Sequence, residues 1–223
     1  MLLGARQFFE RRAAQAWTNP YVTDGLVAMW DGEWNAGGGV HDASATVWKD
    51  IVGGVEIPVA SVGDNYVILG YTLAPQLIIS QILGGSYTYE HALTRTSQVT
   101  GAVDYFTTDL GDILQWQYAS SSSWCRLPFG GITWLGGSVL NDVDVMAQSL
   151  ENGNAALYGN GVVKGTSAGI SSVGTTFSRS AVQWEQSNMT SRLHRRISIY
   201  SRALTAEEVA HNYAKDKERF NLP

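Results

Sequence analysis

The segment LHRRISIYSRALTAEEVAHNY, residues 193–213, joins a strand pattern to a helix start. In its first half, apolar and polar residues alternate, as they do in a strand that lies on a core with its other face exposed to water. One arginine does not fit the expected core face, which carries Leu193, Arg195, Ile197 and Ile199. This half of the segment therefore predicts a sheet strand.

The second half of the segment carries the signals of a helix N-terminus. Thr205 stands at the expected N-cap, and Glu208 follows three residues later as its partner in a capping box. Leu204 and Val209 are spaced as a hydrophobic staple, which packs the residue before the cap against the first turn. A short helix is therefore expected directly after the strand.

The strand and helix resemble the C-terminal signature of the concanavalin A-like, laminin-G-like jelly rolls. Two other segments agree: DGLVAMW at 24–30 followed by WKD at 48–50, and ALYGNGVVK at 156–164. The resemblance spans residues 22–213 and implies an all-β fold. That fold is a two-sheet antiparallel jelly-roll sandwich, here with an N-terminal amphipathic helix and a short C-terminal helix. Such motifs identify a scaffold, not a ligand.

The composition fits many short strands joined by tight turns. The chain has 223 residues, 24 of them glycine, and only 16% are charged. One domain is expected over residues 21–223, with a helical appendage over 1–20. Asn160-Gly161 predicts a two-residue hairpin turn with positive φ at both positions. Further strands are expected at 25–30, 66–71, 86–93, 113–118, 142–148 and 155–158.

Residues 1–17 predict an amphipathic helix whose apolar stripe needs a partner. Three partners are open: the chain's own sandwich, a neighbouring subunit in a larger assembly, or a membrane surface. We expect a homo-oligomer, with contacts to other virion or surface subunits through this helix. The assembly residues would be Leu2, Ala5, Phe8, Phe9 and Ala13.

Charge and cysteine content exclude several classes of protein. A net charge of −5 lacks the basic surface that nucleic-acid binding normally needs. The single cysteine, Cys125, cannot form an internal disulfide. No apolar run is long enough to span a membrane, and the N-terminus lacks a signal peptide. A jelly roll without a signal suits a phage virion component released by lysis, so we expect a virion surface or extracellular location.

Enzyme motifs are present only in fragments. The sequence GTSAG at 165–169 matches the nucleophile elbow with Ser167, but the residues behind it do not favour the helix that an elbow requires. Laminarinase-type glycosidases of this superfamily carry three acidic residues on one strand, whereas Asp142 and Asp144 lack a third. No catalytic residue is therefore assigned, and a non-catalytic chain is expected.

Acidic loops suggest a calcium site, which the resemblance also implies at one rim of the sandwich. The first candidate set is Asp31, Glu33 and Asp42, and the second is Asp104, Asp109 and Asp112. Neither set has the order of an EF-hand. The four histidines, His41, His91, His194 and His211, show no zinc spacing. Calcium is thus the single metal considered, and no other cofactor is expected.

Tryptophans in segments rich in glycine and serine suggest glycan binding, because sugar rings stack on exposed aromatic faces. The candidates are Trp34, Trp124 and Trp134. Their alternative role is in the core or an interface. The resulting hypothesis is a recognition or structural module of a phage virion, such as a decoration, fibre or tail protein, that binds cell-surface glycans. The alternatives are a bacterial adhesin module and a glycosidase with a degenerate motif.

Overall fold

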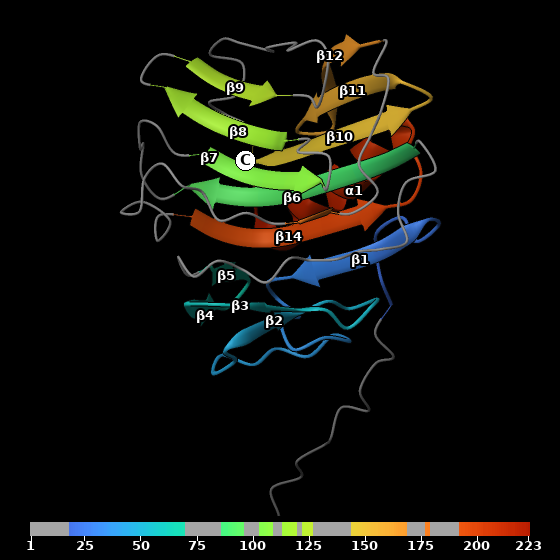
Figure 1. The fold of residues 1–223 in the computed structure, drawn as a ribbon. Helices are drawn as coiled ribbons and strands as arrows, with labels where there is room; N and C mark the ends of the chain where they lie inside the picture. The colour runs from blue at the N-terminus through green and yellow to red at the C-terminus, as the bar shows by residue number, and fades with distance from the viewer. Residues whose placement is uncertain are drawn as a thin grey trace, which may run out of the picture.

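The computed structural model describes residues 18–69, 86–95, 144–168 and 192–223, together with the backbone of strands at 103–108, 113–119, 122–126 and 177–178. Antiparallel sheets and one C-terminal helix make up this part of the chain (Figure 1). The expected all-β class is confirmed. The jelly-roll arrangement and the boundary after residue 20 stay predictions, and the helix expected at 1–17 lies outside the described residues.

The largest sheet has eight strands in the order β12-β11-β10-β6-β14-β5-β4, and β1 also pairs with β14. All of its pairs are antiparallel. Its strands are β1 (Leu26–Asp31), β4 (Ser61–Gly63), β5 (Tyr66–Ile68), β6 (Ser86–Arg95), β10 (Val145–Glu151), β11 (Asn154–Gly159), β12 (Val162–Ser167) and β14 (Arg192–Tyr200).

Two smaller sheets accompany it. The four-stranded sheet has the order β13-β7-β8-β9, and β2 pairs with β3. Their strands are β2 (Val47–Lys49), β3 (Glu56–Pro58), β7 (Val103–Thr108), β8 (Ile113–Ala119), β9 (Ser122–Arg126) and β13 (Phe177–Ser178). The strands expected near residues 66, 86, 113, 142 and 155 are all present, with shifted ends.

Both faces of β14 are buried, which corrects the expectation of one face exposed to water. Ile197 and Ile199 lie in the main hydrophobic cluster together with Trp30 and Trp48. The opposite face packs beneath helix α1 (Ala206–Phe220), which Figure 1 draws behind β6, β10 and β14. The predicted alternation holds from Arg196 to Tyr200, and there the helix covers the face that the sequence left for solvent.

A β-bulge explains why Arg195 does not fit the strand pattern. His194 pairs with Leu93 of β6, and the next paired residue is Arg196, opposite Ala92. The extra residue shifts the alternation by one, which places His194 on the same face as Ile197. Arg195 is half-buried and donates hydrogen bonds to Thr94 Oγ1 at 2.8 Å and to Asn65 Oδ1.

The expected helix start is confirmed atom by atom. Thr205 Oγ1 accepts the Glu208 amide at 3.2 Å, and Glu208 Oε2 accepts the Thr205 amide at 2.9 Å. Leu204 and Val209 are both buried in a second apolar cluster. The helix ends at Asn221, whose left-handed conformation (φ 51°) closes the last turn.

The expected hairpin is confirmed as well. Asn160 and Gly161 have φ angles of 50° and 74°, and Gly159 pairs with Val162 across the turn. Asn160 Oδ1 also accepts the backbone amides of Asp144 and Val145, at 3.0 and 3.1 Å. The turn therefore ties the β11–β12 hairpin to the start of β10.

Candidate functional site

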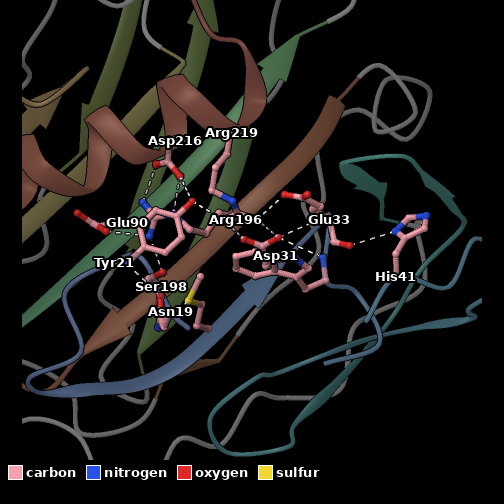
Figure 2. Close-up of polar contacts among 12 residues, drawn as sticks. Asn19, Tyr21, Asp31, Glu33, His41, Glu90, Arg196, Ser198, Asp216 and Arg219 are labelled. Atoms are coloured by element: carbon pink, nitrogen blue, oxygen red, sulfur yellow. Dashed lines mark hydrogen bonds and ion pairs between the residues drawn. The ribbon is translucent and has the colours of Figure 1, made fainter. Parts of the chain in front are cut away.

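Arg219 of α1 holds together several residues for which the sequence suggested metal or glycan binding (Figure 2). Its guanidinium donates to both carboxylate oxygens of Asp31, at 2.7 and 3.0 Å, and to Glu33 Oε2 at 2.7 Å. Its central carbon lies 3.6 Å from the centre of the Trp34 ring. The end of β1 is thereby fastened to the last turn of α1.

The first set of expected calcium ligands does not form one cluster. Asp31 and Glu33 converge on a cation, but that cation is Arg219. Asp42 is exposed, and its carboxylate accepts the amide and hydroxyl of Ser44 at 2.8 and 2.6 Å. Among the described residues, no group of three acidic, histidine or cysteine side chains is placed to hold a metal ion. In the second set, Asp104 lies in β7 and the other two residues, Asp109 and Asp112, are outside the described part.

The glycan candidates are spread along the chain. Trp34 is half-buried, with Arg219 over one face of its ring, so this face is closed to a sugar. Trp124 lies in β9, of which the backbone alone is described, and Trp134 is outside the described residues, as are the five assembly residues at 2–13. Asp144 directly precedes β10, and Ser167 is the last residue of β12. The described candidates thus lie in separate segments of the fold.

A buried ionic network lies between the sheet and α1, next to the Arg219 cluster (Figure 2). Arg196 is completely buried and forms two hydrogen bonds with Asp216, at 2.8 and 2.7 Å. It also donates to Glu90 Oε2 at 2.8 Å. Asn212 donates to the same glutamate oxygen at 2.9 Å, and the Tyr21 hydroxyl donates to Asp216 Oδ1 at 2.8 Å.

Burial sets the direction of the pKa shifts of two carboxyls, one in this network and one in the Arg219 cluster beside it. Burial raises the pKa of Glu90, although the positive charge of Arg196 opposes the shift. Burial likewise raises the pKa of Asp31, against the hydrogen bonds and charge of Arg219. Both groups therefore bind a proton more tightly in the folded chain than in the unfolded chain.

We expect the effect of Glu90→Gln on the free energy of unfolding to become more favourable as the pH rises. A carboxyl with a raised folded-state pKa contributes most stability at low pH, and that contribution falls as the pH passes from about 4 to above the raised value. Glutamine keeps an oxygen for Arg196 and Asn212 but does not titrate. The unfolding free energy of the variant relative to wild type should therefore increase between pH 4.5 and pH 7 in urea titrations. A difference independent of pH would contradict this assignment.

A surface hollow of about 490 Å³ lies over the face of β10, β11 and β12 beside the start of α1. Ser149, Ala156 and Thr166 form one row across these strands, because they are direct cross-strand partners. The small Ala156 side chain occupies the middle of this row, between two hydroxyl groups. Glu151 and Asn154, another directly paired couple, line the same hollow.

The segment between β14 and α1 forms one wall of the hollow, through Ala203 and Leu204. Thr88 of β6 fixes this wall: its hydroxyl donates to the Arg202 carbonyl at 3.0 Å and accepts the Leu204 amide at 2.7 Å. Thr88 itself pairs with Ser149. Strand β6 therefore pairs with the floor strand β10 and, through Thr88, also holds the wall segment in place.

The hollow presents polar groups that the protein itself does not use. Within the described part of the chain, the side chains of Ser149, Glu151 and Thr166 make no hydrogen bond or ion pair, although Ser149 is only 6% exposed. The Tyr158 ring borders them. Hydroxyl, amide and carboxylate groups around a small floor suit a polyhydroxylated ligand. No residue that lines this hollow was predicted from the sequence as a site residue.

Comparison with known proteins shows a shared fold. No protein-family model and no curated protein sequence matches the chain. Among solved structures, Trypanosoma rangeli sialidase bound to 2,3-difluoro-KDN is 14% identical with a TM-score of 0.63, covering 87% of this chain and 33% of the sialidase. The same sialidase with sialic acid gives 12% and 0.61, with 87% and 33% covered. The chain thus spans about a third of the sialidase length.

A second kind of neighbour is the binding domain of Paraclostridial mosquitocidal protein 1. It is 14% identical, has a TM-score of 0.55, and matches over 86% of this chain and 52% of its own length. Sialidases and the binding domain of a mosquitocidal protein therefore share the β fold of this chain. At this level of identity the likeness concerns the fold alone.

The expectation of a non-catalytic chain is contradicted, because the first structural neighbours are sialidases. The expectation rested on two observations from the sequence. The three acidic residues of laminarinase-type glycosidases are not present on one strand, and the residues behind Ser167 do not favour the helix of a nucleophile elbow. Glycosidases with a tyrosine nucleophile do not use that pair of carboxylates. The absence of the laminarinase carboxylates therefore does not show that a chain with this fold is not an enzyme.

In the described residues, no helix has the length and apolar character to cross a membrane.

Proposed function

We propose that this chain is a carbohydrate-binding domain of concanavalin A-like type and that the hollow over β10–β12 receives the sugar. The observation that carries the proposal is the row of hydrogen-bonding side chains around Ala156, which have no partner among the described residues. The neighbours support it at the level of fold. A place on a phage particle or a cell surface, as one subunit among several, belongs to the same proposal and rests on the sequence.

The chemistry of the hollow fits sugar hydroxyl groups. Each hydroxyl both donates and accepts a hydrogen bond, and Ser149 and Thr166 offer the same pair of functions from opposite sides of Ala156. The Asn154 amide and Glu151 carboxylate add a donor and acceptors. The side chains of Ala156, Ala168 and Ala203 add apolar carbon to the lining, on which the C–H groups of a sugar ring can rest. Such a site binds weakly alone and gains strength when displayed in many copies.

We expect Ala156→Phe to abolish glycan binding. A phenyl ring at the centre of the row fills the hollow and separates the hydroxyls of Ser149 and Thr166. Protein displayed in many copies on beads is applied to a glycan array, and the variant should lose at least tenfold in signal, about 1.4 kcal/mol in binding free energy. Unchanged binding would show that the hollow is not the sugar site.

Two controls separate a blocked site from a damaged fold. Ala214→Phe adds the same ring at an exposed position of α1 and should leave binding intact. Thr166→Val removes one hydroxyl with almost no change in shape and should weaken binding without changing the melting temperature by more than a few degrees. Retained binding in Thr166→Val, together with loss in Ala214→Phe, would contradict the proposed location.

A further inference from the structure

We infer that the hollow selects uncharged sugars over sialylated ones, an inference that rests on the proposed carbohydrate function. The sialidases that share the fold include complexes with sialic acid, which carries a carboxylate. A site for such an anion normally offers an arginine or lysine, since charge-assisted hydrogen bonds give the strongest recognition of a carboxylate. The described residues that line this hollow instead carry a negative charge, on Glu151.

Glu151 is the one charged side chain among the described residues that line the hollow. It lies at the end of β10, is exposed, and forms no ion pair with any described residue. No cation in the described part of the chain therefore neutralises its charge. Arg202, which directly precedes the wall residues Ala203 and Leu204, is engaged by Glu208 at 2.6 Å and by Asp24 at 2.8 Å. A sialic acid carboxylate in the hollow would meet a like charge.

The same carboxylate favours neutral sugars. Two oxygens of a glutamate can accept hydrogen bonds from two adjacent ring hydroxyls, which a neutral hexose supplies. Asn154 stands directly opposite Glu151 across the hairpin and can donate its amide to a third oxygen. Ser149 and Thr166 remain for the other edge of the ring. The described lining residues thus offer hydrogen-bonding groups for a neutral ring and no cation for an acidic one.

The test compares beads carrying a galactose-terminated glycan with beads carrying the same glycan capped by sialic acid. Wild-type protein should bind the uncapped glycan at least tenfold more strongly at low salt. Glu151→Gln should reduce this preference, and Glu151→Lys should reverse it. Asp64→Lys, at the opposite edge of the sheet between β4 and β5, makes the same change in net charge and should keep the wild-type preference.

The outcomes distinguish the inference from the function on which it depends. Equal binding of both glycans, or a preference for the capped one, overturns the selectivity and leaves sugar binding in place. An equal shift in Asp64→Lys and Glu151→Lys also overturns it, because the effect would then come from overall charge. Failure of the wild type to bind any glycan on a broad array overturns the proposed function itself. Far-ultraviolet circular dichroism confirms that each variant is folded.

Discussion

Arg196→Met should destabilise the fold by about 3–5 kcal/mol, because it leaves two buried carboxylates without their cation. Arg196 is fully buried, and its guanidinium contacts both Asp216 and Glu90. Methionine keeps much of the side-chain volume but supplies no charge or hydrogen bond. The melting temperature should fall by about 6–20 °C. A loss of this size is a large part of the usual stability of a domain.

Two further variants test the origin of that loss. Lys215→Met removes the exposed ion pair with Glu218 and should change stability by about 1 kcal/mol or less. Adding Glu90→Gln to Arg196→Met removes one of the orphaned charges, so the double variant should be less destabilised than the sum of the two single variants. Strict additivity would mean that Arg196 acts by packing and not through its charge.

Asp50→Ala should be the second severe substitution, with a loss of about 3 kcal/mol or more. The Asp50 carboxylate accepts three backbone amides, from Met29 at 2.8 Å, Val52 at 2.9 Å and Gly53 at 2.8 Å. Hydrogen bonds to charged groups each contribute about 1.5–3 kcal/mol, and their loss leaves amides of a strand and a tight loop without an acceptor. Urea denaturation measures the change.

The control for Asp50→Ala is an exposed aspartate that contacts a residue two positions away. Asp42→Ala removes an exposed carboxylate that binds only Ser44, and its effect should be much smaller than that of Asp50→Ala. Asp50→Asn keeps one acceptor oxygen and should fall between alanine and wild type. Equal losses in the two alanine variants would show that the loop at 50–55 does not depend on its buried carboxylate.

Local chemistry explains which parts of the fold the sequence could predict. The capping box at Thr205 and the Asn160-Gly161 turn are formed by residues a few positions apart, and both are confirmed. The bulge at Arg195 was visible as a break in the pattern, but its cause lies in the register with β6. The cover that α1 places over β14 could not be read from either segment alone.

The candidate site depended on partners that are far apart in the chain. The sequence predicted that Asp31 and Glu33 lie together and bind a metal cation. The cation that they bind is instead the guanidinium of Arg219, 188 residues after Asp31. The floor of the hollow was within reach of sequence reasoning, since Ser149 and Ala156 belong to two expected strands. Its wall, however, depends on the bond between Thr88 and Leu204, 116 residues apart.

The position of α1 at the end of the described chain has a consequence for biosynthesis. A ribosome delivers Glu90 first and Arg196 106 residues later, which takes about 5–20 s at ordinary rates of elongation. Asp216 follows after 20 more residues. Throughout that interval the sheet face that carries Glu90 lacks its cover, and water must solvate the glutamate. Nascent chains stalled before α1 should therefore expose this face to chaperones and proteases until the helix packs over it.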